Sequence, residues 1–285
     1  MFRLFRSTRE WIRDVALSPG TRVKISLGSA DLDVRGGELG KLRALVKYEV
    51  LPGEEARTEH ILEHLLLREE KGELRVSLPK PLEFLASEAR IELPKDVELE
   101  IETGSGDIVL EGWSGKAQVV LGSGDLEVSQ LQGTVFLRSG SGDVDLVQVY
   151  GALELSLASG DVSGQDVRGS LRVKTSSGDI CLSGFQGDLD VSTGSGDVAV
   201  EGVPEEGREW RVRTNSGDVQ VKVPGETELA LDLTTSSGDI SCSLPLAVEV
   251  RDEKRLKGQL GPRPKGSLRV TTGSGDIAVR EKHGV

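Results

Sequence analysis

The sequence predicts an all-β fold: a single-chain β-solenoid, similar to a parallel β-helix, wound from coils of roughly 18 residues, with a short N-terminal helical cap. Three observations predict it. The tripeptide Ser-Gly-Asp recurs nine times along the chain, apolar residues recur at fixed distances after each of these Asp residues, and a second glycine recurs between consecutive tripeptides. Such periods indicate coils that stack on one another.

The Ser-Gly-Asp corners are spaced too regularly for chance. Successive Asp residues are separated by 18 residues five times, and then by 21, 21 and 37. A degenerate copy, Gly28-Ser29-Ala30-Asp31, precedes them, so the winding is predicted to begin near residue 21. The nine corner residues are Asp107, Asp125, Asp143, Asp161, Asp179, Asp197, Asp218, Asp239 and Asp276.

The apolar pattern predicts the strands of each coil. Counted from the corner Asp, apolar residues stand at +1, +3, +6, +10 and +12, and steps of two are typical of a strand with one buried face. The parity changes at +6, which predicts a bend there. In one coil these residues are Leu126, Val128, Leu131, Val135 and Leu137. A second corner is predicted at +8, occupied by Gly115, Gly133, Gly151, Gly169 and Gly187.

The corner residues have physical reasons to be there. Glycine reaches the positive φ that a tight turn requires. The short side chains of Ser and Asp can accept hydrogen bonds from backbone N–H groups just ahead of them and so close Asx- and ST-type turns. Aromatic residues make up only 4% of the chain, which fits a narrow aliphatic core between strands stacked about 4.8 Å apart.

The chain is predicted to form effectively one continuous domain. Its parts are a tail or cap at residues 1–20, irregular coils at 21–102 with a helical excursion near 54–71, and the regular solenoid at 103–280. The excursion is expected to cover one end or side of the solenoid. Insertions fall near 204–208, 224–228 and 249–266; they are read either as solvated loops or as one decorated edge that binds a partner.

The net charge and the targeting signals limit which partners and which location are expected. A formal net charge of −12 repels a phosphate backbone, so nucleic-acid binding is not expected. The N-terminus has no uninterrupted apolar stretch of a signal peptide and no segment is apolar enough to span a membrane, which favours a cytoplasmic location. Residues 1–20 interleave apolar and Arg side chains, so they either cap the first coil or make peripheral contact with an anionic membrane. Cys181 and Cys242 are expected to be reduced thiols.

The run from Ile91-Glu92-Leu93-Pro94-Lys95 to Thr103-Gly104-Ser105-Gly106-Asp107-Ile108, followed by the recurring corners, resembles the bacterial putative-adhesin family, a domain of unknown function built of β-strand repeats. The resemblance covers about residues 21 to 280. It implies a β-solenoid and no known catalytic residue.

Two motifs suggest metals. The corners are similar to the calcium-binding nonapeptide β-roll, which makes Asp107, Asp125, Asp143, Asp161, Asp179 and Asp197 weak calcium candidates against a reading as turn caps. One residue of that motif is missing, and the opposite corner usually lacks an Asp. His60 and His64 match the inverted zinc-hydrolase motif HxxEH, a short match in a capping segment. No cofactor is expected, and no nucleophile, base and orienting group can be assembled, so the chain is predicted not to be an enzyme.

The predicted function is a non-catalytic structural or interaction module that binds an unknown protein partner or copies of itself. One alternative is end-to-end polymerisation like that of bactofilin scaffolds, because only Arg280 to Val285 follow the last corner and would cover the C-terminal end. The other alternative is a calcium-responsive adhesin.

Overall fold

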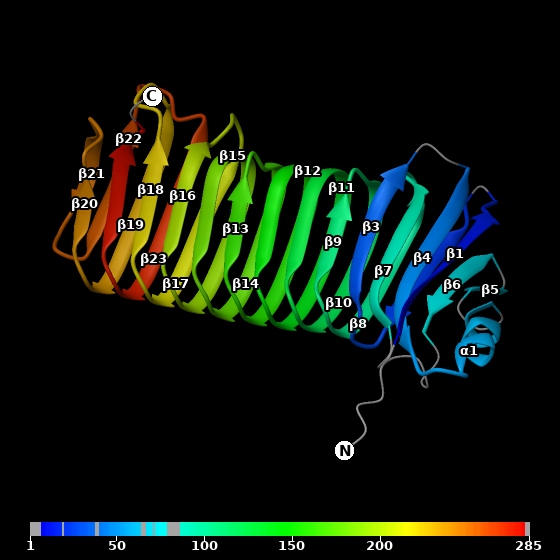
Figure 1. Ribbon diagram of the computed structural model, residues 1–285. Helices are drawn as coiled ribbons and strands as arrows, with labels where there is room; N and C mark the ends of the chain where they lie inside the picture. Colours follow the sequence, from blue (N-terminus) through cyan, green and yellow to red (C-terminus); the bar gives the residue numbers. More distant parts are fainter. Residues whose placement is uncertain are drawn as a thin grey trace, which may run out of the picture. The chain divides into compact units, whose positions relative to one another are not determined.

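The computed structural model describes residues 7–18, 20–37, 40–63, 67–70, 72–78 and 86–282. The chain divides into two compact units, Met1–Gly142 and Asp143–Val285, and both are built almost entirely of β-strands (Figure 1). No helix among the described residues is long and apolar enough to cross a membrane. The all-β, solenoid-like character predicted from the repeat is confirmed.

Unit 2 stacks parallel strands in which residues 18 apart in the sequence lie opposite one another, as Leu153, Leu171 and Leu189 do. Their side chains are buried and form the core. The strands are β12 (Val144–Ser159), β13 (Val162–Gln165), β14 (Arg168–Ser177), β15 (Ile180–Ser195), β16 (Val198–Val203), β17 (Glu209–Ser216), β18 (Val219–Val223), β19 (Leu229–Ser237), β20 (Ile240–Cys242), β21 (Ala247–Arg251), β22 (Arg255–Leu260), β23 (Gly266–Ser274) and β24 (Ile277–Glu281).

The glycines of the corners are required by the closeness of neighbouring coils. A Cβ atom on Gly178 would lie 2.0 Å from the carbonyl oxygen of Gly160, and one on Gly187 would lie 1.9 Å from that of Gly169. Both glycines also have positive φ, of 134° and 127°. A side chain at either corner would therefore force two coils apart.

The bend predicted near +6 is present, and the residue just before it makes the bend. Position +5 adopts a left-handed backbone in successive coils, whether or not it is glycine. Its occupants, with their φ angles, are Gly112 (64°), Gln130 (52°), Gln148 (55°), Asp166 (54°) and Gly184 (68°). The bend lets an apolar residue at +6, such as Val149 or Phe185, point into the core although the strand parity has changed.

The C-terminal end of unit 2 corrects one expectation. The last coil in the sequence is not the last in space: β23 lies between β17 and β19, and β24 lies between β18 and β20. Figure 1 shows the red C-terminal strand between yellow β18 and orange β20. Residues 229–242 form the outermost coil, and β22 pairs antiparallel with β19 to cover it. The prediction that only Arg280 to Val285 cover this end is wrong.

Unit 1 is interleaved in the same way. The early strand β2 inserts between β6 and β8, and β3 inserts between β7 and β9. The strands are β1 (Ser7–Ala16), β2 (Arg22–Leu27), β3 (Asp31–Gly37), β4 (Lys41–Val50), β5 (Leu67–Glu70), β6 (Glu73–Ser77), β7 (Ala86–Pro94), β8 (Glu98–Ser105), β9 (Ile108–Glu111), β10 (Ser114–Ser123) and β11 (Leu126–Ser141).

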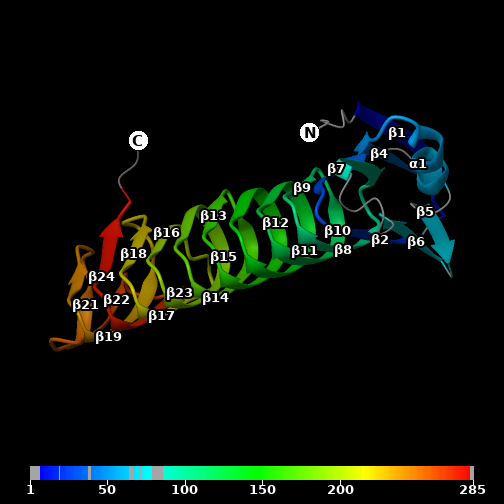
Figure 2. The same cartoon turned by 60° about the horizontal axis from the view of Figure 1, so that its bottom comes forward.

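The helical excursion is shorter than predicted. Helix α1 (Glu55–Ile61) is a segment of only 7 residues, and residues 67–70, which the apolar spacing placed in the helix, form β5 and pair antiparallel with β6. Four residues suffice for a strand when a neighbouring strand supplies the hydrogen bonds, so tertiary pairing overrides the local spacing. Figure 2 shows α1 near β1 and β4.

Within the predicted tail of residues 1–20, residues 7–16 form a strand, and residues 1–6 and 19 lie outside the described residues. β1 pairs with β4 over its full length, from Ser7 opposite Val50 to Ala16 opposite Lys41. Trp11 is buried and Ile12 is 59% exposed. This arrangement supports the reading of the tail as a cap; membrane contact stays a prediction.

Candidate functional site

The corner Asp residues form a ladder of hydrogen bonds between coils. In unit 2 the backbone N–H of Asp161 donates to Oδ1 of Asp143 at 2.8 Å, and the N–H of Asp179 donates to Oδ1 of Asp161 at 2.7 Å. The pattern continues through Asp197, Asp218, Asp276 and Asp239 at 2.7 to 2.8 Å. Unit 1 has the same bonds among Asp31, Asp107 and Asp125.

The ladder corrects the predicted role of these side chains. The acceptor carboxylate does not close its own turn; it bonds to the N–H of the equivalent Asp in the neighbouring coil. A charged acceptor makes such a bond stronger than a neutral one. Oδ1 of each of these residues thus has a structural task that needs no cation, and no group of three or more His, Cys, Asp or Glu side chains in the described part of the chain is placed to hold a metal ion.

The zinc candidates are not brought into a site among the described residues. His60 is exposed in the last turn of α1, and His64 lies outside the described residues. The two cysteines are free, as expected: Cys181 is exposed on β15, and burial raises the pKa of the Cys242 thiol.

Sequence patterns missed one buried polar position. Four residues before the corner Asp, several coils place a buried Thr or Ser where the alternation calls for an apolar side chain. In some coils its hydroxyl donates to the backbone carbonyl two residues ahead, as Thr175 Oγ1 does to Ser177 O at 2.8 Å, and in others to a corner glycine of the neighbouring coil, as Thr272 Oγ1 does to Gly217 O at 3.2 Å. The Thr or Ser at an otherwise apolar position of the repeat is the sequence signal that could have predicted this buried hydroxyl.

The three predicted insertions adopt different structures. Residues 204–208 and 224–228 form turns near the predicted corner. The third insertion is not an edge loop, because β21 and β22 form an antiparallel hairpin whose Leu256 and Leu260 are buried. The expected partner-binding loop of Arg251 to Lys265 is therefore, for the most part, a cap on the outermost coil.

One polar surface of unit 2 is the outer face of β12, β14, β15, β17, β23, β19 and β22. Strand register aligns its exposed side chains in rows that cross the strands. The first row contains Glu154, Arg172, Asp190, Arg211, Arg269, Asp232 and Lys257. The second row contains Ser156, Lys174, Ser192, Arg213, Thr271, Thr234 and Arg255. We call these two rows the cationic band.

Two carboxylates link the rows. Asp190 lies 2.9 Å from Arg213 Nη2 and 3.5 Å from Arg172 Nε. Asp232 lies 3.2 Å from Arg255 Nη2 and 3.9 Å from Arg269 Nε. Each carboxylate thus neutralises one of two cations beside it, and the band has seven cations for three carboxylates.

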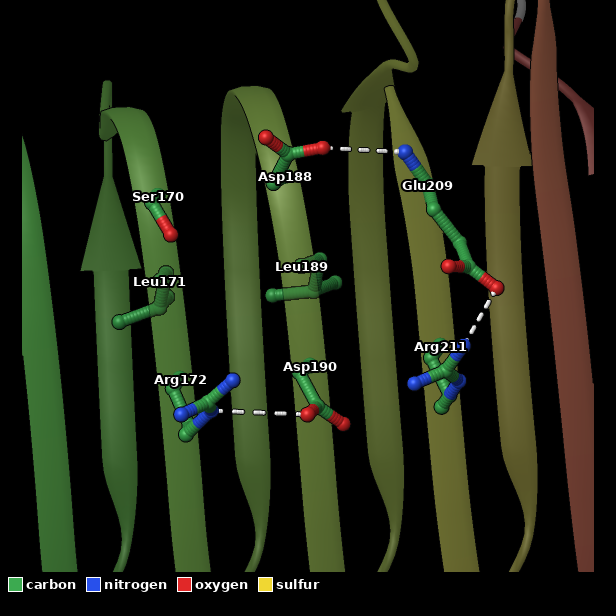
Figure 3. A pocket seen from close by; sticks show the side chains of 8 residues that line it. All are labelled: Ser170, Leu171, Arg172, Asp188, Leu189, Asp190, Glu209 and Arg211. Atoms are coloured by element: carbon green, nitrogen blue, oxygen red, sulfur yellow. Dashed lines mark hydrogen bonds and ion pairs between the residues drawn. The ribbon is translucent and has the colours of Figure 1, made fainter. Parts of the chain in front are cut away.

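A hollow of about 190 Å³ opens on this face between β14, β15 and β17. Figure 3 shows Arg172, Asp190 and Arg211 side by side across its lower part, and Asp188 at its upper end accepting from the backbone N–H of Glu209 at 3.1 Å. The Glu209 carboxylate pairs with Arg211 at 2.8 Å. The lining comprises Ser170, Leu171, Arg172, Asp188, Leu189, Asp190, Glu209 and Arg211. Hydroxyl, guanidinium and carboxylate groups at the rim can bind a polar ligand, and the shallow form suits part of an extended chain.

Comparison with known proteins gives the chain a family. No curated protein matches it. A solved structure of a putative lipid binding protein from Parabacteroides distasonis ATCC 8503 is similar with a TM-score of 0.50 and 14% identity, covering 96% of this chain and 97% of that one. This likeness shows a shared fold.

Two further structures match with lower scores. A putative adhesin from Bacteroides fragilis NCTC 9343 has a TM-score of 0.43 and 12% identity, covering 95% of this chain and 97% of that one. A putative cell adhesion protein from Clostridium sporogenes ATCC 15579 has a TM-score of 0.29 and 14% identity, covering 97% and 100%. The family model described as Toastrack DUF4097 matches residues 23–166 and 132–280, so together its matches span most of the sequence. The chain belongs to the Toastrack DUF4097 family.

Proposed function

We propose that this protein is a non-catalytic, adhesin-like interaction module, in which a rigid stack of β-coils presents ordered rows of side chains to a macromolecular partner. The observation that carries the proposal is the register of unit 2. Because each strand is held opposite its neighbour, Arg172, Asp190 and Arg211 stand in line on three strands. A surface that is already ordered loses little conformational entropy on binding.

The cover on the outermost coil of unit 2 favours a discrete module over a filament. β22 occupies the edge of β19 that the next copy would need for end-to-end stacking. The strand beyond it, β21, has a register shift between Val248 and Val250, an irregularity that hinders continued pairing. Polymerisation like that of bactofilins would require the β21–β22 hairpin to detach from β19.

A binding panel tests the proposed function. The purified chain is passed over immobilised purified macromolecules, namely matrix proteins, mucin, peptidoglycan, and neutral and acidic polysaccharides, and binding is followed by surface plasmon resonance. We expect saturable binding to at least one class with no chemical change in it, together with a monomer of 30.5 kDa by light scattering at all concentrations. Absence of binding to every member, or turnover of one, would contradict the proposal.

A calcium-responsive adhesin remains the second candidate carried from the repeat. If calcium bound the ladder, its addition would raise the melting temperature and a chelator would lower it. The bonds from the backbone N–H groups to Oδ1 support the opposite expectation, an unchanged melting temperature. The predicted cytoplasmic location is tested by cell fractionation; recovery in the envelope or the medium would contradict it.

A further inference from the structure

The second row of the cationic band contains no carboxylate, whereas the first row contains three. The second row places three cations among four hydroxyls: Ser156, Lys174, Ser192, Arg213, Thr271, Thr234 and Arg255 follow one another across seven strands. Lys174 makes no ion pair with any described residue and is exposed. Arg213 and Arg255 share their charge with Asp190 and Asp232 of the first row, so the positive charge in excess lies at Lys174 and in the surplus of four cations over carboxylates in the band, on a chain whose net charge is −12.

The spacing of the cations is set by the sheet. Lys174 on β14 and Arg213 on β17 are two strand steps apart, about 10 Å at about 4.8 Å per step. Arg213 and Arg255 are three steps apart, about 14 Å. Ser192, Thr271 and Thr234 stand between them and can donate and accept hydrogen bonds. A ligand that fits this row is linear, carries anionic groups at intervals, and is rich in hydroxyls between them.

We propose that the cationic band binds an acidic polysaccharide chain that lies across the strands along the second row. The proposal rests on the proposed function and deepens it by naming the class of partner. A flat membrane would also meet the carboxylates of the first row and of Asp188 and Glu209 beside it, whereas a linear chain can follow the carboxylate-free row. Carboxylate groups of the sugar acids would pair with Lys174, Arg213 and Arg255, and sugar hydroxyls would face the Ser and Thr side chains.

The hollow beside the second row can bind a further part of the same polysaccharide. Arg172 and Arg211 of the first row line it together with the hydroxyl of Ser170. Arg172 is 51% exposed in its side chain and is held only loosely, at 3.5 Å from Asp190. A branch or a ring substituent of the polysaccharide could enter here while the main chain follows the second row.

The test compares two variants with the same change in charge. In the band variant, Lys174, Arg213 and Arg255 are each replaced by Gln; in the control variant, Lys222, Arg280 and Lys282 are replaced by Gln. The control residues lie on or after β18 and β24 and outside the band. Equal melting temperatures of both variants and the parent chain establish that folding is preserved. The probes are polygalacturonate, neutral dextran, vesicles of anionic lipid and duplex DNA, each at several salt concentrations.

We expect the parent chain to bind polygalacturonate and not dextran, with affinity falling as salt rises. The band variant should lose on the order of tenfold to a hundredfold in affinity, as expected for three exposed ion pairs, and the control variant should bind like the parent. Equal loss in both variants, or equal binding of dextran, would overturn the inference. Binding confined to vesicles, DNA or a protein of the panel would overturn it while leaving the interaction-module function standing; no binding to anything would remove both.

Discussion

At the scale of single residues, the repeat uses some positions for backbone geometry and others for polar bonds between coils. Position +5 must be left-handed, and Gln148 occupies it at a φ of 55°. An L-residue pays about 1–2 kcal/mol for this conformation, whereas glycine does not. The corner Asp, in contrast, is selected for a carboxylate that reaches the next coil. The chain tolerates strain at the first position and needs a specific side chain at the second.

Replacing Gln148 by Gly should stabilise unit 2. Relief of the left-handed strain outweighs the larger entropy that glycine loses on folding, and the expected gain in free energy of unfolding is about 0.5–1 kcal/mol. The measurement is the urea midpoint. Gln165, an exposed strand residue without positive φ, is the matched control, and Gln165→Gly should lose roughly 0.5–1 kcal/mol. A loss of stability in both variants would show that position +5 carries no strain.

Trp113 and Trp210, the two most deeply buried tryptophans, should respond differently to replacement by Phe. Trp210 donates its indole N–H to Gly187 O at 2.9 Å and packs edge-on against Phe185 with ring centroids 5.6 Å apart. The indole N–H of Trp113 is buried and has no hydrogen-bond partner. Trp210→Phe leaves a buried carbonyl without this donor, while Trp113→Phe removes an unpaired donor. We expect Trp210→Phe to lower the free energy of unfolding by about 1–2 kcal/mol more than Trp113→Phe does. Equal losses by chemical denaturation would contradict this account.

At the scale of elements, strands are placed by pairing partners that lie far away in the sequence. β1 is held on β4 partly by Asp14, which accepts hydrogen bonds from Arg43 at 2.8 Å and from Lys41. Both cations hold the pKa of Asp14 well below its usual range. Likewise β22 is held on β19 through Leu256 and Leu260. These contacts decide what covers each end of its unit.

The docking of β1 should weaken in acid. A carboxyl whose pKa is lowered by folding contributes stability above its unfolded value of 3.8, and this contribution is lost progressively as the pH falls below that value. At pH 7, Asp14→Asn should reduce the amide-exchange protection of residues 7–16. Below pH 3.8, the difference in protection between the variant and the parent chain should become smaller. Glu10→Gln is the control on the same strand, since Glu10 forms no ion pair with a described residue, and it should leave protection unchanged. A pH-independent difference would rule out titration of Asp14 as the cause.

Loosening the β21–β22 hairpin should allow self-association. Leu256→Asp with Leu260→Asp places two charges where side chains are 5% and 3% exposed, so β22 should detach and leave an edge of β19 unpaired. Light scattering should then show a mass that rises with concentration. Lys257→Ser with Gln259→Ser changes the outward side of the same strand and should stay monomeric. A monomeric double-Asp variant would show that the hairpin is not the barrier to stacking.

At the scale of the whole molecule, both units follow one plan in which late or early segments of the chain insert between others. In unit 1, β2 and β3 enter from the N-terminal side; in unit 2, β23 and β24 return between coils that precede them. The insertion leaves antiparallel strands as the outer elements. The result within each unit is a regular stack whose outer strands are the least regular part, and in unit 2 the broad charged face lies on the regular strands.

Within the regular repeats, the sequence by itself determined the strands, the two corners of each coil and the buried apolar residues, because each depends on local geometry: side-chain alternation, the bend and the close approach at glycine. It also placed the Asp residues at equivalent positions, although their carboxylates bond to the next coil and not to their own turn. Only the tertiary structure decided the order of coils in space, the conversion of the charged insertion into a cap, and the alignment of Lys174, Arg213 and Arg255. These depend on register between distant segments, which is fixed by hydrogen bonds across strands and leaves no local signal in the sequence.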